Sequence, residues 1–202
     1  NVGSISASVS AAEPEAYVGG IVGRTADNAM IENCTNKATV HGAQYNVGGI
    51  VGFTNRATVV SGCVNYGTIS TDMNTVGGIV GYNRGKSTVT MCVNYGDVSA
   101  ANTSTANAGG IAGRNYQSTI EYCINYGNIT GAGQKVGGIA GTNEYTGGAL
   151  RYSYNVGNVT GSSSYVGALV GYQNKATIDR NYYLTSATYT DGKGTAQKGV
   201  GN

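Results

Sequence analysis

The segment Val-Gly-Gly-Ile-Val-Gly decides the fold, because it recurs along the chain at a nearly constant spacing. It stands unchanged at Val18–Gly23, Val47–Gly52 and Val76–Gly81, and as variants at Ala108–Gly113, Val136–Gly141 and Val166–Gly171. The start-to-start spacings are 29, 29, 32, 28 and 30 residues. A fixed period of this length is the signature of a repeat architecture.

Two further blocks follow each segment in a constant order. The first block ends on a cysteine in Ile31–Cys34, Val60–Cys63, Val89–Cys92 and Ile120–Cys123, and Leu150–Ser153 and Ile178–Asn181 continue it without the cysteine. The second block is Asn65–Ile69, Asn94–Val98, Asn125–Ile129 and Asn155–Val159. Asn1–Ile5 matches the same block, so we expect the chain to begin inside a larger protein.

Each repeat offers three short β-branched runs separated by Gly, Asn and Ser, a pattern typical of strands. Three short strands cannot bury a face alone, but stacked repeats align equivalent positions about 4.8 Å apart in parallel ladders. We therefore predict an all-β fold, a right-handed parallel β-helix (β-solenoid) of about six coils of 30 residues over residues 1–184. Residues 185–202 are expected to be a C-terminal extension or a linker.

Stacking turns each repeated position into a column along the solenoid axis. The predicted core column is Ile21, Ile50, Ile79, Ile111, Ile139 and Leu169. The predicted polar column is Asn36, Asn65, Asn94, Asn125 and Asn155, whose amides can hydrogen-bond from coil to coil and satisfy turn backbone groups. We interpret both columns as structural.

The four cysteines, Cys34, Cys63, Cys92 and Cys123, fall in one column. A zinc site needs four sulfurs about 2.3 Å from one ion, whereas four coils span about 14 Å. Disulfides between adjacent coils fit poorly, because parallel side chains keep their Cβ atoms farther apart than the usual ~3.8 Å. We favour buried free thiols that pack as small hydrophobic groups.

Composition and charge argue against several functions. The net charge is +2 without a basic block, so neither a nucleic-acid partner nor an anionic membrane surface is expected. No run approaches the ~18 apolar residues of a membrane span. The ten acids are scattered, and His41 is the only histidine, with no evident nucleophile partner. We expect no catalytic residues, no metal site and no cofactor.

Aromatic residues form the one candidate contact site. Tyr66, Tyr95 and Tyr126 follow the asparagines of their repeats and should stack beside the turn. Phe53, Tyr82 and Tyr172 form a second, interrupted column after the glycine-rich segment. Such columns could make a flat strip that stacks sugar rings, or they could be ladders that only stabilise the sheet. The pattern leaves both interpretations open.

The Val-Gly-Gly-Ile-Val-Gly segment with its downstream Cys-x-Asn-Tyr-Gly block resembles the GLUG repeat, and the resemblance covers nearly the whole chain. It implies a large secreted or wall-attached bacterial protein, commonly Gram-positive and adhesin-like. Some GLUG proteins are immunoglobulin A-specific metallopeptidases, but the His-Glu-x-x-His motif of zinc peptidases is absent here. The family's functional residues are poorly defined, so the resemblance implies none for this chain.

These observations predict a non-catalytic extracellular module, structural or adhesive, of a bacterial surface protein. Its expected partners are host glycan or extracellular protein, together with other domains of the same chain. A carbohydrate-active β-helix enzyme, either a lyase or a hydrolase, is the alternative, and it requires clustered Asp, Glu, Lys or Arg in a groove. A passive accessory region of a surface metallopeptidase is a third hypothesis.

Overall fold

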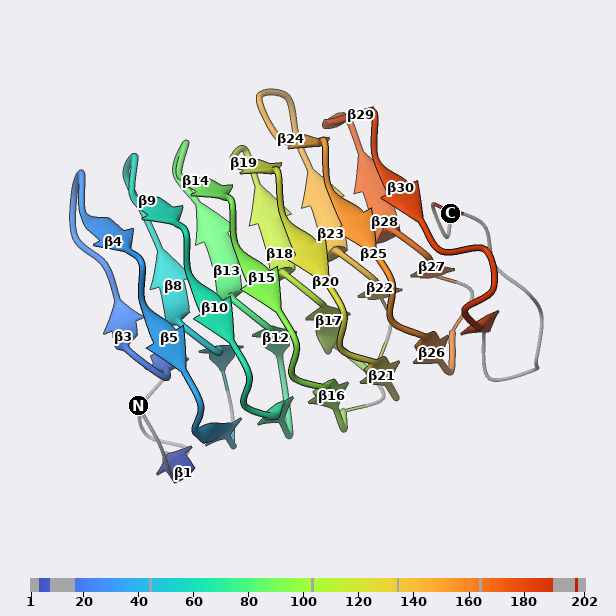
Figure 1. Cartoon of the computed structure of the whole chain (residues 1–202), viewed down its shortest axis with the longest axis horizontal. Coiled ribbons are helices and arrows are strands. Elements are labelled where there is room, and N and C mark those ends of the chain that lie inside the picture. Colours follow the sequence, from blue (N-terminus) through green and yellow to red (C-terminus); the bar gives the residue numbers. More distant parts are fainter. Residues whose placement is uncertain are drawn as a thin grey trace.

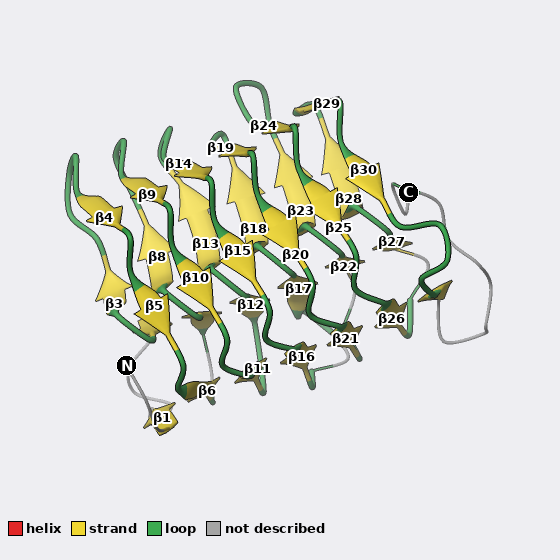
Figure 2. Cartoon of the chain, in the orientation of Figure 1, coloured by secondary structure: helices red, strands yellow, loops and turns green. Residues whose placement is uncertain are grey.

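The computed structural model describes residues 4–7, residues 17–190 apart from 44, 103, 134 and 164, and residue 199. These residues form coils that follow one another along one axis, from the blue N-terminal end to the red C-terminal end of Figure 1. Figure 2 shows strands and loops, without a helix among the described residues. The predicted all-β parallel solenoid of about six coils is confirmed.

Strands from successive coils build five parallel sheets, which we call A to E. Sheet A contains β1 (Ser4–Ala7), β6 (Thr39–Gly42), β11 (Ile69–Thr71), β16 (Val98–Ala100), β21 (Ile129–Gly131), β26 (Val159–Gly161) and β31 (Tyr189–Thr190). Sheet B contains β2 (Tyr17–Gly19), β7 (Asn46–Gly48), β12 (Thr75–Gly77), β17 (Asn107–Gly109), β22 (Lys135–Gly137) and β27 (Tyr165–Gly167). Sheet C contains β3 (Val22–Arg24), β8 (Val51–Thr54), β13 (Val80–Arg84), β18 (Ala112–Tyr116), β23 (Ala140–Glu144) and β28 (Val170–Asn174).

The remaining two sheets complete each coil. Sheet D contains β4 (Met30–Glu32), β9 (Val59–Ser61), β14 (Thr88–Thr90), β19 (Thr119–Glu121), β24 (Ala149–Arg151) and β29 (Thr177–Asp179). Sheet E contains β5 (Thr35–Asn36), β10 (Val64–Asn65), β15 (Val93–Asn94), β20 (Ile124–Asn125), β25 (Tyr154–Asn155) and β30 (Tyr182–Tyr183). The chain passes through B, C, D, E and A in turn, and then enters the next coil.

Each coil therefore has five strands rather than three, because two of the apolar runs are bent. The run Val18–Gly23 is divided at Gly20 and Ile21, between β2 and β3. The run that ends on Asn36 bends at Asn33, which has a left-handed φ of 54°. The same corner is left-handed in every coil, at Asn33, Gly62, Met91, Tyr122, Tyr152 and Arg180. Only one of these residues is glycine, so the stacked coils and not local preference impose this conformation.

The strand register places equivalent residues over one another, as predicted. Val47 pairs with Val18 on one side and with Val76 on the other. The N-terminal block follows the same rule, since Ile5 of β1 pairs with Val40 of β6. Residues 1–3 of that block lie outside the described residues.

The interior consists of two apolar clusters separated by the asparagine column. One cluster lies among sheets C, D and E and contains Ile50, Val60 and Cys63. The other lies between sheets A and B and contains Val47 and Ile69. Each asparagine lies between the clusters, because its amide reaches from sheet E to the bend between sheets B and C, where it meets a glycine.

The second glycine of each Gly-Gly pair makes room for that amide. A Cβ atom placed on Gly78 would lie 2.3 Å from Cγ of Asn94, and 2.2 Å from the carbonyl oxygen of Gly110 in the next coil. The last repeat has Ala168 at this position and Tyr183 in place of the asparagine. The glycine thus changes to alanine where its asparagine is missing, which explains why the two motifs occur together.

The two ends of the stack differ from its middle. The predicted core column is buried from Ile50 to Leu169, but Ile21 is 41 % exposed, because among the described residues its segment pairs only with the following coil. At the other end Tyr183 packs on both apolar clusters and meets the ring of Tyr189 edge-on at 5.4 Å.

The ladder runs on past Leu184. β31 pairs with β26, and the carbonyl of Gly199 accepts a hydrogen bond of 2.9 Å from the Leu169 amide. Residues 191–198 and 200–202 lie outside the described residues, so the boundary between the solenoid and residues 185–202 stays a prediction.

Candidate functional site

Tyr66, Tyr95 and Tyr126 form a column of stacked rings on the outside of the solenoid. Each is the first residue after a sheet E strand: Tyr66 follows β10, Tyr95 follows β15 and Tyr126 follows β20. The ring centroids are 5.0 Å apart for Tyr66 and Tyr95 and 4.9 Å apart for Tyr95 and Tyr126, with planes within 4° of parallel. The rings are 53 %, 46 % and 44 % exposed. The predicted aromatic stack is therefore present and accessible.

The stacking limits what this column can bind. Tyr95 has a parallel ring on either side, so both of its faces are turned toward neighbouring tyrosines. A sugar that stacks on an aromatic side chain needs a free ring face, and the inner ring offers none. The column instead presents ring edges and a row of phenol hydroxyls, which can donate and accept hydrogen bonds.

A second stack lies at the corner between sheets D and E. The rings of Tyr122 and Tyr152 are 5.0 Å apart and within 4° of parallel, and the guanidinium of Arg180 lies 4.7 Å from the Tyr152 centroid. We did not expect this stack from the sequence. The available signal was a tyrosine directly before the last residue of the cysteine block in two successive repeats.

The other aromatic column, on sheet C, is not a flat strip, which favours the second of the two interpretations, a ladder that stabilises the sheet. Phe53 is only 5 % exposed, and its ring meets Tyr82 edge-on at an interplanar angle of 88°. The guanidinium of Arg114 lies 5.0 Å from the Tyr82 centroid. Ring faces here are occupied by cations and ring edges, because sheets B and C meet at a sharp bend that crowds their outward side chains.

The cysteine column is as predicted a set of free thiols. Cys63, Cys92 and Cys123 are buried and Cys34 is half-buried. The Cys92 thiol donates to the carbonyl of Thr90 at 3.2 Å. The hydrogen bond with the Cys92 thiol and then burial raise the pKa of Cys63, so the neutral thiol is the stable form. Among the described residues, no group of three or more His, Cys, Asp or Glu side chains could hold a metal ion.

His41 does have polar partners, contrary to our expectation. It lies on strand β6, where its Nδ1 is 2.9 Å from Oγ of Ser70 in the next coil, and its Nε2 is 3.3 Å from Oδ2 of Asp72. Sequence spacing concealed this group, because its members come from neighbouring coils. The three side chains lie on the half-exposed outer side of sheet A. We interpret them as polar contacts that join two adjacent coils.

One buried carboxylate, that of Glu144, is at the end of strand β23 and lies on the outer side of sheet C. Oε2 of Glu144 is 2.7 Å from Nη2 of Arg114, and Nζ of Lys135 is 3.9 Å from its other oxygen. The hydroxyl of Thr142, in the same strand as Glu144, is buried without a hydrogen-bond partner. Glycoside hydrolysis usually requires two acidic side chains, and this cluster has one. We interpret Glu144 as a buried counter-ion for the two cations.

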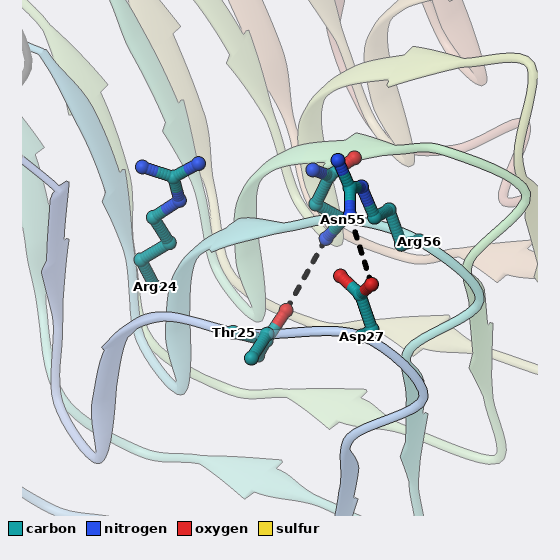
Figure 3. A pocket seen from close by; sticks show the side chains of 6 residues that line it. Arg24, Thr25, Asp27, Asn55 and Arg56 are labelled. Atoms are coloured by element: carbon teal, nitrogen blue, oxygen red, sulfur yellow. Dashed lines mark hydrogen bonds and ion pairs between the residues drawn. The ribbon is translucent and has the colours of Figure 1, made fainter.

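A small hollow lies at the corner between the first two coils. Figure 3 shows the residues that line it: Arg24, Thr25, Asp27, Asn55 and Arg56. Polar groups of these residues form hydrogen bonds from one coil to the next. Nη1 of Arg56 donates to Oδ2 of Asp27 at 2.8 Å, and the backbone N–H of Asn55 donates to Oγ1 of Thr25 at 3.2 Å. The hollow is therefore part of the structural corner.

The asparagine column forms the predicted ladder. From Asn36 to Asn125, the Nδ2 of each asparagine donates to Oδ1 of the next at 2.8 Å, and the Nδ2 of all five donates to the carbonyl two residues onward in its own turn. A second amide ladder, which the sequence analysis missed, runs through Thr54, Asn83, Asn115, Asn143 and Gln173 in sheet C. Variation between Thr, Asn and Gln hid this column. Both ladders are buried and structural.

The fold and these ladders define a parallel β-solenoid protein whose accessible candidate contact site is a column of tyrosines. A family model described as the GLUG motif matches residues 15–40. Residues 17–40 of this match form most of the first described coil, and the register stacks the later coils on it, so the chain carries a GLUG motif within a repeated coil. No curated protein and no solved structure gives a significant match. Nothing among the described residues offers a helix that could cross a lipid bilayer.

Proposed function

We propose that this GLUG-repeat solenoid is a non-catalytic, extracellular structural and adhesive module of a bacterial surface protein. The observation that carries the proposal is the continuous ladder, in which every coil is tied to the next by five sheets and by buried amide bonds. Such a stack makes a stiff rod of on the order of 30 Å. A rod of this kind can hold other domains of the same protein apart.

The adhesive part of the proposal is assigned to Tyr66, Tyr95 and Tyr126. Their edges and hydroxyls lie on the surface of a rigid sheet, so binding orders few side chains. Tyrosine contributes much contact area at a small cost in side-chain entropy, which favours it in contact surfaces. The partner would be an extracellular protein or the hydroxyl groups of a host glycan.

An array of host glycans and extracellular proteins tests this assignment. The wild-type chain is compared with a triple variant in which Tyr66, Tyr95 and Tyr126 become alanine, and with a control in which the exposed Tyr145 and Tyr165 become alanine. We expect at least one ligand whose binding falls about tenfold or more in the triple variant only, as for a central aromatic contact. Equal binding by all three proteins would remove the tyrosine column from the proposal.

Localisation needs a separate measurement. Intact cells of the source bacterium are treated with a protease that cannot enter them, and the chain is followed with an antibody. Loss of the chain from intact cells is the expected result. Protection until the cells are lysed would contradict an extracellular position.

A further inference from the structure

Sheet E turns half-buried apolar residues outward and buries polar ones, the reverse of an ordinary solvated sheet face. In β10 Val64 faces outward while Asn65 is buried, and in β20 Ile124 faces outward while Asn125 is buried. Such an inversion leaves apolar surface in water. Contiguous exposed apolar patches of this kind mark interaction surfaces.

Three columns make up this surface, which we call the sheet E face. The middle column, on the strands themselves, is Thr35, Val64, Val93, Ile124, Tyr154 and Tyr182. The column two residues earlier in each coil is Asn33, Gly62, Met91, Tyr122, Tyr152 and Arg180. The column two residues later is Lys37, Tyr66, Tyr95, Tyr126, Val156 and Leu184. The corresponding strands lie side by side in Figure 1. The charged members of these columns, Lys37 and Arg180, belong to the first and last coils, so the central coils present an uncharged face.

The period of this face matches that of another solenoid. Its rings recur at 5.0 and 4.9 Å, close to the spacing of about 4.8 Å between parallel strands. A second copy of the chain has the same period, so the side chains of two copies can stay in register from coil to coil. A sugar chain would need free ring faces, and the stacked tyrosines turn theirs toward one another.

A two-fold axis parallel to the solenoid axis keeps equivalent coils of two copies at the same height. That symmetry sets the middle column against itself and each flanking column against the opposite one. Tyr66 then faces the space above Gly62 of the second copy, and Tyr95 faces Met91. Lys37 faces Asn33, so the face brings no like charges together. Reversing one copy end to end would instead set each flanking column against itself, with Lys37 opposite Leu184 and Arg180 opposite Asn33.

The area of the face sets the strength of the contact. Five coils at about 4.8 Å and a width of four residues at about 3.3 Å give roughly 300 Å² per copy. Stable dimers commonly bury about 800 Å² per partner. The contact is therefore weak and concentration-dependent, and it would act chiefly where many copies are held close together.

We propose that the sheet E face is a self-association surface that pairs two copies of this chain in parallel. This inference deepens the proposed function, because it names a second copy of the chain as a partner of the sheet E face. It rests on the proposed function only in treating this face as a contact surface. Surface-attached rods that pair side by side in this way would be stiffer than single rods.

Sedimentation equilibrium over a hundredfold range of concentration tests the pairing with the whole chain. We expect the mean mass to rise toward twice that of the monomer at the highest concentrations. The variants Tyr95→Lys and Tyr122→Lys should remain monomeric throughout, because each introduces a charge at the centre of the face. Tyr165→Lys, on sheet B, should behave as the wild type, and circular dichroism should report folded protein for all of them.

A disulfide experiment tests the orientation. The double variant Tyr95→Cys with Met91→Cys should form a covalent dimer on mild oxidation, whereas Tyr165→Cys should not. A dimer without this cross-link would overturn the parallel arrangement, and a wild-type chain that stays monomeric at every concentration would overturn the self-association itself. If that monomer still binds an array ligand through Tyr66, Tyr95 and Tyr126, the adhesive proposal stands while this inference fails.

Discussion

Replacing Asn94 with alanine tests whether the buried amide ladder stabilises the solenoid. The Nδ2 group of Asn94 donates to the carbonyl of Gly96 and to Oδ1 of Asn125, both at 2.8 Å, and Oδ1 of Asn94 accepts from Asn65 at 2.8 Å. Alanine leaves three buried polar groups each short of one partner. The fully buried position excludes bulk water from all three groups.

The expected loss follows from that count. A buried group left without its partner costs about 1–3 kcal/mol, so three such groups give about 3–9 kcal/mol. A water molecule entering the vacated polar space would bring the loss toward the lower value. The matched control is Asn128→Ala, whose exposed amide donates to Asp97 at 3.1 Å. It should cost less than about 1 kcal/mol.

Urea unfolding followed by far-ultraviolet circular dichroism measures both variants. The unfolding free energy of Asn94→Ala should fall by several times that of Asn128→Ala with an unchanged denaturant slope. Asn94→Asp adds a second check, because it keeps the size but loses both donated hydrogens. Its loss should shrink as the pH falls, since a protonated carboxyl regains one donor. Equal losses for Asn94→Ala and Asn128→Ala would refute the ladder as a source of stability.

Three further predictions follow from the packing of the coils. Gly48→Ala should lower the unfolding free energy by more than about 3 kcal/mol, because its Cβ atom would lie 2.0 Å from the carbonyl oxygen of Val51; a melting temperature within a few degrees of that of Ala168→Gly would contradict this. A thiol reagent should modify the half-buried Cys34 first and reach Cys63, Cys92 and Cys123 only in denaturant; rapid reaction of several thiols in the folded chain would count against the packing. Stability should also fall at alkaline pH: burial raises the pKa of Tyr189 from 10.0 to about 12, and the pKa values of Cys63 and Cys92 are raised above 9.0. The folded chain holds these protons longer than the unfolded chain, so the contribution is complete below about pH 9 and is lost as the pH rises. Melting temperatures that stay level from about pH 8 to about pH 11 would be the contrary result.

The sequence alone determined the architecture, because each repeat carries the residue types that stacking requires. A column of identical residues such as Asn65, Asn94 and Asn125 has a period that can be read directly from the chain. The free thiols, the core column from Ile50 to Leu169 and the tyrosine stack followed from this register, and the structure confirms them, whereas Ile21 of the predicted core column is exposed. The five-strand coil did not follow, because the bend at Asn33 and its equivalents is made by residues without a common type.

Only the tertiary structure decided how side chains from different coils meet. It brought His41 to Ser70 and Asp72, and it stacked the rings of Tyr122 and Tyr152. It also showed that sheet E buries asparagine and exposes valine, which an alternating pattern leaves ambiguous because either set of residues could face inward. The physical reason is that the sequence period fixes which residues are stacked, whereas the bends of the coil fix which way each column points and what faces it.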